Sequence, residues 1–182
     1  MHRLATLLTV GTAALGSAAL TAARPADAQE TAVATLLDAE GKELGRAQLV
    51  EGPAGVVLRI ELVGLEPGFK GLHFHSVGTC EDHHAGFKAS GGHVNPDQVE
   101  HGFLNPKGPD DGDLPNLGVA ADGSAQAEVF STFVSLSGLG DRPALLDADG
   151  SALVIHANTD DHLSQPIGGA GDRIACGVIE QD

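Results

Sequence analysis

The sequence predicts an all-β domain that carries two long loops. Three observations favour this fold class. Short apolar or alternating segments recur between turn-forming Gly, Pro and Asp residues, and helical periodicity is absent from those segments. Two Gly-rich stretches then interrupt the series without any strand pattern. Antiparallel sandwiches and barrels show this regular spacing of strands and turns.

Eight segments fit the strand pattern, and in chain order they are 31–37, 44–51, 56–63, 71–77, 117–120, 125–133, 152–156 and 173–179. The separators 38–42, 52–55 and 66–68 each place Gly or Pro where the backbone must reverse. Asp122-Gly123 marks a further turn. Short connections of this kind are typical of antiparallel neighbours.

The two stretches without strand pattern are 78–116, rich in Gly, Pro, Asp and His, and 157–172, rich in Gly. Loops of this length inside a compact domain are usually functional or disordered. We expect these two loops to lie together over one side of the scaffold, where they could form a site.

The first 28 residues have the pattern of a secretory signal peptide. Residues 1–3 carry positive charge, 4–22 are almost wholly apolar or small, and 26–28 end the segment with small residues. A retained membrane anchor is the alternative, but Gly, Thr and Ser interrupt the apolar run. We therefore expect 1–28 to be removed on export, leaving 29–182 as one domain in the periplasm or outside the cell.

The chain is strongly acidic. Its formal net charge is −15 at pH 7, and it becomes −16 when Arg3, Arg24 and Asp27 leave with the signal peptide. Such a chain is not expected to bind nucleic acid, and no membrane contact is expected after the signal is removed. Because acidic surface repels small anions, an anionic substrate would need a local focus of positive charge.

Cys80 and Cys176 are the only cysteines. Export would place them where a disulfide forms and persists, so we expect them to be bridged. Two free buried thiols are the alternative.

The histidines indicate a metal site. His73 and His75 flank Phe74 on a predicted strand, so their two imidazoles share one face while Phe74 points to the other. A pair of solvent-facing histidines would look the same. However, eight of the nine histidines, all except His2, lie between residues 73 and 162. Imidazole suits copper and zinc, and the single Met argues against a soft thioether copper(I) site.

Seven segments, in order, resemble the copper/zinc superoxide dismutases, and especially the bacterial periplasmic branch of that family. They are GLHFH at 71–75, Cys80, GGHVNP at 91–96, EHG at 100–102, GDLPNL at 112–117, VIHANTDD at 154–161 and GGAGDRIACGVI at 168–179. This resemblance implies an eight-stranded Greek-key β-barrel or sandwich with two long functional loops.

The resemblance also implies one copper ion and one zinc ion per chain. Four histidines would hold copper: His73, His75, His93 and His156. His93 would bridge to zinc, which would be held in addition by His101 and Asp113. The family's remaining zinc ligand is a histidine three residues before that aspartate, and this chain has Asp110 there.

Three interpretations of Asp110 are open. The carboxylate could ligate zinc directly, it could swing away and leave an open or weak site, or His83 or His84 could take its place. His83, His84 and His162 are otherwise expected to be solvated loop residues. In each case we expect weaker zinc retention than with a histidine.

By the same resemblance, Asp160 would accept hydrogen bonds from His73 and His101 and so tie a copper ligand to a zinc ligand. An ordinary turn residue is the alternative for Asp160. Arg173 would flank the copper channel and attract superoxide, and a surface ion pair with Asp172 is the alternative.

The function implied by the resemblance is the dismutation of superoxide to dioxygen and hydrogen peroxide, an antioxidant defence. His93 would take up a proton when its bond to copper breaks and return it in the second half of the cycle. Superoxide is the expected partner, and a homodimer would be compatible with the family. The alternative is an exported copper/zinc binding protein without turnover, which would need neither Arg173 nor Asp160 nor the disulfide.

Overall fold

Nine strands make up the scaffold in residues 29–182, the part of the chain that the computed structural model describes. They are β1 (Thr31–Asp38), β2 (Glu43–Gly52), β3 (Gly55–Leu62), β4 (Gly68–Lys70), β5 (Leu72–His75), β6 (Leu117–Val119), β7 (Ala125–Ser131), β8 (Ala152–His156) and β9 (Arg173–Gln181). All eight predicted strands are present, and their ends agree with the sequence pattern to within two residues. The predicted signal peptide, residues 1–28, lies outside the described residues.

The ninth strand, β4, was not predicted. It lies directly before β5, and Gly71 separates the two. A Cβ atom at Gly71 would lie 2.8 Å from the Cβ of Ala170 in the second long loop, so that loop needs a glycine here to pass over the strand. The expected count of eight strands is one short, because 66–68 has the pattern of a turn and the next predicted strand begins only at Gly71.

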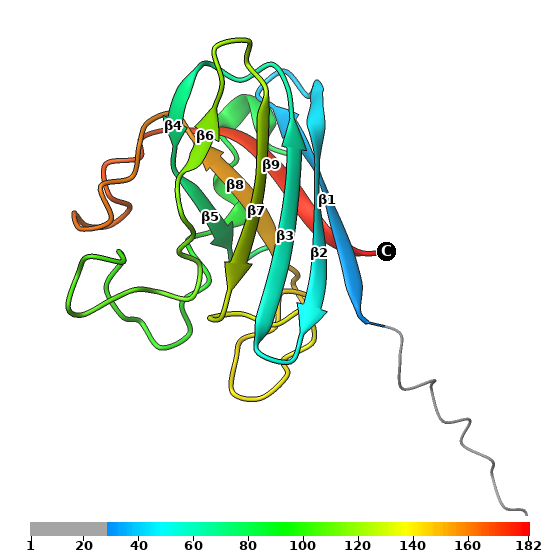
Figure 1. Cartoon of the computed structure of the whole chain (residues 1–182), viewed down its shortest axis with the longest axis vertical. Helices are drawn as coiled ribbons and strands as arrows, with labels where there is room; N and C mark the ends of the chain where they lie inside the picture. The colour runs from blue at the N-terminus through cyan, green and yellow to red at the C-terminus, as the bar shows by residue number, and fades with distance from the viewer. Residues whose placement is uncertain (1–28) are drawn as a thin grey trace, which may run out of the picture.

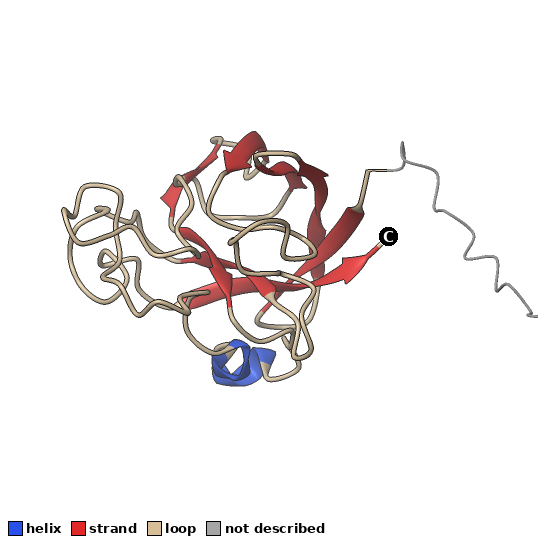
Figure 2. Cartoon of the chain, turned by 90° about the horizontal axis from the view of Figure 1, so that it is seen from below, coloured by secondary structure: helices blue, strands red, loops and turns tan. Residues whose placement is uncertain are grey.

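Seven strands form one antiparallel sheet in the order β5-β8-β9-β1-β2-β3-β7, and β4 pairs with β6. Neighbours that are distant in sequence, such as β5 with β8 and β1 with β9, require crossovers over the ends of the sheet. Seen from below, the sheet curls round on itself and encloses the interior (Figure 2). The predicted all-β class is confirmed.

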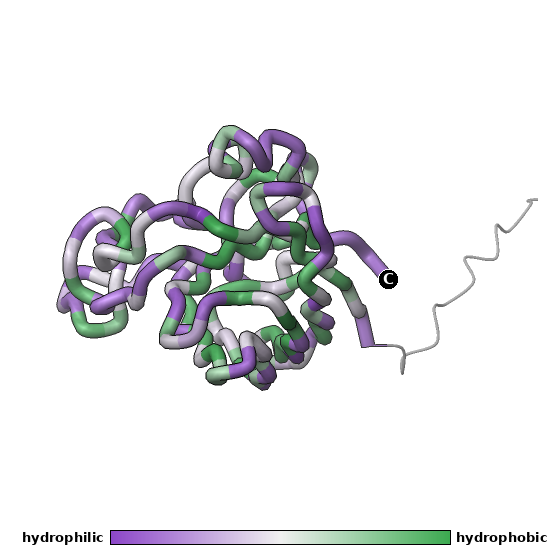
Figure 3. Tube along the Cα trace, turned by 90° about the horizontal axis from the view of Figure 1, so that it is seen from above, coloured by the Kyte–Doolittle hydropathy of each residue, from purple (hydrophilic) through white to green (hydrophobic). Residues whose placement is uncertain are grey.

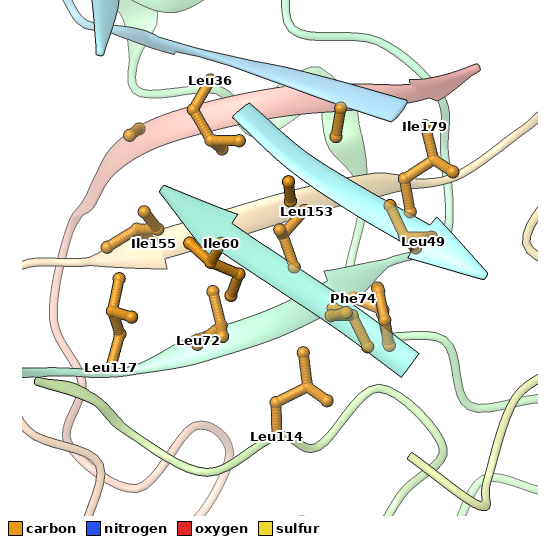
Figure 4. Packing of buried hydrophobic residues seen from close by; sticks show 14 of the residues in the cluster. Leu36, Leu49, Ile60, Leu72, Phe74, Leu114, Leu117, Leu153, Ile155 and Ile179 are labelled. Atoms are coloured by element: carbon orange, nitrogen blue, oxygen red, sulfur yellow. The ribbon is translucent and has the colours of Figure 1, made fainter. Parts of the chain in front are cut away.

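The core fills this curled sheet with alternate residues from each strand. Leu58 and Ile60 of β3 are buried while Arg59 and Glu61 between them face solvent. The labelled side chains in Figure 4, Phe74 among them, point from several strands into the same interior. Phe74 is fully buried there, as its place between two histidines predicted. Burial of each such side chain contributes roughly 1.5–3 kcal/mol to folding.

The two long loops lie side by side and project from one side of the sheet (Figure 1). The amide of Leu104 in the first loop donates to the carbonyl of His162 in the second, at 2.9 Å. The first loop also contains two short 3₁₀ helices, η1 (His83–Ala85) and η2 (Lys88–Ser90). Apolar segments are interspersed among hydrophilic ones along both loops (Figure 3). Among the described residues, no helix has the length and apolar character needed to span a membrane.

Candidate metal centre

Four histidines meet at the end of the β5–β8 pair. His73, His75, His93 and His156 each bring a ring nitrogen within 4.8 Å of the others. Alternation along β5 puts the first two on one face, and β8 ends beside them because it runs antiparallel to β5. His93 comes from the first long loop and forms an isolated β-bridge with His75. Residues far apart in the sequence therefore reach one point.

The second nitrogen of each of these four rings is hydrogen-bonded to a group that can only accept, and for His93 that group is Oδ2 of Asp110, 2.9 Å from Nδ1. Nδ1 of His75 lies 3.0 Å from the Gly91 carbonyl, and Nδ1 of His156 lies 3.0 Å from that of Gly171. Nε2 of His73 lies 2.9 Å from Oδ2 of Asp160. Each of these nitrogens must therefore carry the hydrogen in a neutral ring, and the opposite nitrogen keeps its lone pair.

The nitrogens left with lone pairs are buried and have no hydrogen-bond partner. They are Nδ1 of His73, Nε2 of His75, Nε2 of His93 and Nε2 of His156. A buried polar atom without a partner is costly, and four of them converge here. A set of imidazole lone pairs around one point fits a copper ion.

Burial keeps the rings of His73, His75 and His156 neutral at pH 7. It lowers the pKa of His73 to about 3, against the opposing effect of its hydrogen bond to Asp160. It also lowers the pKa of His156 to about 4, although the hydrogen bond to Gly171 opposes the shift. The pKa of His75 falls to about 2, because the charge of Arg173 adds to burial. The ligand atoms are thus available without prior loss of a proton.

A second ligand group lies next to the first and shares His93. It consists of His93, His101, Asp110 and Asp113. Nδ1 of His93 lies 2.9 Å from Oδ2 of Asp110 and 3.7 Å from Oδ1 of Asp113, while Nδ1 of His101 lies 2.5 Å from that Oδ1 atom. Two imidazoles and two carboxylates, all from largely buried side chains, fit a zinc ion.

The loop that carries these ligands is fixed against β5. The amide of Phe74 donates to the Gly112 carbonyl at 2.8 Å, and the amide of Val94 donates to the Phe74 carbonyl at 3.0 Å. His73 and Asp113 also form an isolated β-bridge. Segments on both sides of the zinc ligands thus extend the ladder of β5, which explains why β5 and the first long loop supply every ligand of the two groups except His156 of β8.

Of the three interpretations of Asp110, the geometry agrees best with direct ligation. The Asp110 side chain is 4% exposed and faces His93. His83 and His84 lie on η1, where their rings pack together at 4.0 Å and Nδ1 of His83 lies 3.1 Å from the Ala39 carbonyl. Neither histidine belongs to the three groups of metal-capable side chains found among residues 29–182.

Asp160 lies between the two groups. Its Oδ2 atom is 2.9 Å from Nε2 of His73, and its Oδ1 atom is 3.1 Å from Nε2 of His101. Both of the predicted hydrogen bonds are present. Burial opposes a charge on His101, but the hydrogen bonds and charges of Asp113 and Asp160 outweigh it and raise the pKa of His101 to about 10. The hydrogen bonds from His101, His73 and the His162 amide hold the pKa of Asp160 well below its usual value despite its burial.

An open cavity of about 550 Å³ leads to the rings of His75, His93 and His156. Arg173 lines it, and its guanidinium donates to the carbonyls of Phe87 at 2.6 Å and Gly91 at 2.7 Å. The alternative of an ion pair with Asp172 is not seen among the described residues. The two carbonyls and the hydroxyl of Ser90, 3.1 Å from the guanidinium, instead hold the charge of Arg173 at the cavity wall.

Cys80 and Cys176 form the predicted disulfide, with their Cα atoms 5.7 Å apart. The bond joins residues separated by 96 positions and ties the start of the first long loop to β9. Because Arg173 is three residues before Cys176, the bond also restrains the strand that carries this cation.

A family model described as copper/zinc superoxide dismutase (SODC) matches residues 44–179. The chain belongs to the copper/zinc superoxide dismutase family. It is 54% identical over 151 residues to the superoxide dismutase [Cu-Zn] of Caulobacter vibrioides, a match that covers 82% of this chain and 86% of that protein. It is 42% identical to superoxide dismutase [Cu-Zn] 2 of Aquifex aeolicus, over 80% of this chain and 84% of that protein.

Solved structures of the copper/zinc superoxide dismutase family have the same fold. A SOD-like protein from Bacillus subtilis superposes with a TM-score of 0.75 at 38% identity, covering 80% of this chain and 96% of that one. The Cu/Zn superoxide dismutase from Brucella abortus gives a TM-score of 0.65 at 31% identity, covering 83% and 100%. The family binds copper and zinc, and the two ligand groups described above suit those two ions.

One further residue of this copper/zinc superoxide dismutase fold was missed by sequence reasoning. Asn116 lies in the GDLPNL segment, and its Oδ1 atom accepts from the amide of Asp160 while its Nδ2 atom donates to the carbonyl of Asp160, both at 2.8 Å. The side chain therefore fixes the backbone of Asp160 in both directions. An asparagine in a segment that matches the family was the available signal, but nothing in the pattern connects it with a residue 44 positions away.

Proposed function

We propose that this protein dismutates superoxide, converting two superoxide anions and two protons to dioxygen and hydrogen peroxide. Copper would be held by His73, His75, His93 and His156. Zinc would be held by His93, His101, Asp113 and Asp110. The observation that carries the proposal is the convergence of four buried, unpartnered imidazole nitrogens at a cavity that Arg173 lines.

Bound copper supplies a one-electron acceptor that one superoxide reduces and the next reoxidises, so no other electron donor is needed. Arg173 serves the same cavity with a fixed charge that attracts and orients the anion in an otherwise acidic protein. Lys88 lines the same cavity, whereas Lys70 donates to the Ala157 carbonyl and Lys107 pairs with Glu100 on the surface. Arg173 and Lys88 are therefore the cations placed to act on the substrate.

His93 is the residue placed to move a proton. Its Nε2 atom is buried without a partner on the copper side, and Nδ1 faces Asp110 and Asp113 on the zinc side. Nε2 would take up a proton in one half-reaction and deliver it to the reduced oxygen species in the other. The ligands on the zinc side keep the ring in place throughout.

Asp160 would keep the two groups in a fixed relation, since its carboxylate contacts a histidine of each. Its two hydrogen bonds select the tautomer of His73 whose Nδ1 lone pair faces copper and orient His101 toward zinc.

We further propose that residues 1–28 are a signal peptide and that residues 29–182 act as one domain in the periplasm or outside the cell. The charge and apolar pattern of residues 1–28 supports export. The Cys80–Cys176 disulfide also supports it, because such bonds persist mainly in oxidising compartments.

The test is to measure copper and zinc per chain together with superoxide turnover of the mature protein. We expect one ion of each kind and rapid turnover. His156→Gln should lose copper but keep zinc, and His84→Gln, which changes a histidine outside both groups, should behave as the wild type. Metal binding without turnover by the wild type would favour the carrier alternative and overturn the proposal.

A further inference from the structure

His162 lies against the carboxylate that joins the two ligand groups. Its ring Nδ1 atom is 3.3 Å from Oδ2 of Asp160, and its backbone amide donates to Oδ1 of Asp160 at 2.7 Å. The Nδ1 atom is buried and makes no hydrogen bond in this arrangement, so Oδ2 of Asp160 is the acceptor within ion-pair distance of it, although the side chain as a whole is 19% exposed. His162 was expected to be a solvated loop residue, and its ring instead faces inward.

The surroundings of His162 determine which ring nitrogen carries its hydrogen. Asn116 uses Oδ1 to accept from the Asp160 amide, so its Nδ2 group is the donor that points to Nε2 of His162, at 3.1 Å. Nε2 of His162 must therefore accept. In the neutral ring the hydrogen is then on Nδ1, the atom that faces Asp160.

Phe103 covers the outer side of this ring. The Phe103 and His162 ring centroids are 5.1 Å apart, and Phe103 stacks on Phe133 at 6.2 Å. Phe103 is itself 36% exposed, so it shields the histidine without being part of the main core. The contact covers part of the His162 ring and helps to hold it against the carboxylate.

We infer that His162 is a positioning residue: its Nδ1–H group holds the Asp160 carboxylate in the orientation that contacts His73 and His101. Oδ1 of Asp160 accepts hydrogen bonds from the His101 ring and the His162 amide, Oδ2 accepts one from the His73 ring, and Nδ1 of His162 lies 3.3 Å from Oδ2. This inference rests on the proposed function, because the rings that Asp160 orients are the proposed copper and zinc ligands.

The tautomer of His162 is the first test. In the reduced, copper- and zinc-loaded wild-type protein, which is diamagnetic, ¹⁵N NMR should show a hydrogen on Nδ1 of His162 and a lone pair on Nε2. A hydrogen on Nε2 would direct the lone pair of Nδ1 at the Asp160 carboxylate, and that result would overturn the inference.

Two variants separate the Nδ1 donor from the ring. His162→Phe keeps the ring against Phe103 but removes the donor. His162→Asn keeps an N–H donor at the same distance from the backbone, and asparagine tolerates the positive φ of 58° found here. We expect His162→Phe to release zinc to a chelator on the order of tenfold faster and to change the Cu(II) EPR spectrum, with His162→Asn close to wild type.

Wild-type behaviour of both variants would overturn the inference while leaving the proposed function intact. Equal acceleration of zinc release in both would also overturn it, because the ring and not the donor would then be responsible. A wild-type protein that holds neither ion would instead overturn the proposed function, and this inference with it.

Discussion

Oδ2 of Asp110 lies 2.9 Å from Nδ1 of His93, on the opposite edge of the ring from the unpartnered Nε2 atom. A carboxylate therefore stands on the zinc side of the shared histidine, where the family has an imidazole. Its other oxygen, Oδ1, accepts from the Gly112 amide at 3.0 Å, which fixes the carboxylate in this direction. Under the proposed zinc site, two anionic ligands, Asp110 and Asp113, would stand where the family pattern has one.

Asp110→His should strengthen zinc retention. Imidazole suits zinc better than carboxylate does, and carboxylate-rich sites bind harder ions such as Mn²⁺ more readily. We expect zinc affinity in competition with a chelator to rise on the order of tenfold, about 1.4 kcal/mol, with a smaller Mn²⁺ content after mixed-metal loading. The measurement is metal content per chain after dialysis against graded chelator concentrations.

Asp111→His is the matched control, because it adds a histidine one residue away but outside the ligand groups. It should leave zinc retention unchanged. Equal retention in the wild type and Asp110→His would show that the carboxylate serves zinc as well as the imidazole would.

Gly168→Ala should disrupt the hydrogen bonds of Asp160. A Cβ atom at Gly168 would overlap Oδ1 of Asp160 and lie 2.9 Å from Nε2 of His101. Asp160 would have to move away from the histidines, so we expect zinc release to accelerate by about tenfold or more. Stopped-flow transfer of zinc to a chromophoric chelator would measure this.

Gly169→Ala provides the control for backbone strain. Its φ is 68°, close to the 60° of Gly168, but a Cβ atom there would meet nothing within 4 Å. Both variants therefore carry similar strain, and only the first collides with Asp160. If the two released zinc at the same rate, the effect would be one of loop conformation and not of Asp160 position.

The strands could be predicted because the alternation of apolar and polar residues in a strand is visible within a short segment of sequence. Phe74 between two histidines indicated both a strand and the face that the core would take, and its complete burial bears this out. β4 was not predicted, since its first residue falls in the turn predicted at 66–68 and the strand has only three residues. Strands this short have too few residues for periodicity.

The candidate site was predictable to the extent that its residues fall in segments that resemble a family. The direction of the Asp110 side chain was not predictable, because the sequence alone allows the carboxylate to face inward or outward. Its direction is set by the Gly112 amide and by packing against His93, which are three-dimensional contacts. The same holds for His162, whose ring is oriented by Asn116, 46 residues away.

Arg173→Gln should slow superoxide capture, because it removes the cation that lines the cavity. We expect kcat/KM to fall roughly tenfold or more, and the rate to become less sensitive to ionic strength. Pulse radiolysis at several salt concentrations would measure both effects. The kcat/KM of Arg173→Lys should lie between those of the wild type and Arg173→Gln, since lysine keeps the charge but cannot donate to the carbonyls of Phe87 and Gly91 together.

Lys107→Gln is the control for net charge. Lys107 is a surface cation paired with Glu100, away from the cavity lining, so its loss should leave kcat/KM nearly unchanged. A similar decrease for Lys107→Gln and Arg173→Gln would attribute the effect to the total charge of the protein.

Acid should destabilise the metal-free protein at a higher pH than it destabilises the metal-loaded protein. The pKa values of His73, His75 and His156 are lowered by burial to about 3, 2 and 4, whereas in the unfolded chain each ring titrates near 6.5. Between pH 6.5 and 4 the unfolded state therefore binds up to three more protons than the folded state. The free energy of unfolding must fall as pH falls through this window, and below about pH 4 the lowered pKa values of Asp160 and Asp113 extend the decline.

His101 contributes to the pH dependence of stability with the opposite sign, because its pKa is raised to about 10. Its contribution is complete below pH 6.5 and is lost only as pH rises toward 10, so it cannot offset the acid loss. Bound metal should delay that loss, since protons must compete with the ions for the same lone pairs. Guanidinium chloride unfolding at pH 7.5, 6 and 5 should show the unfolding free energy of the metal-free wild type declining with pH. The decline should be shallower in metal-free His156→Gln and the same as the wild type in metal-free His84→Gln. An unfolding free energy that stayed constant from pH 7.5 to 5 would mean that the three rings are not held neutral by burial.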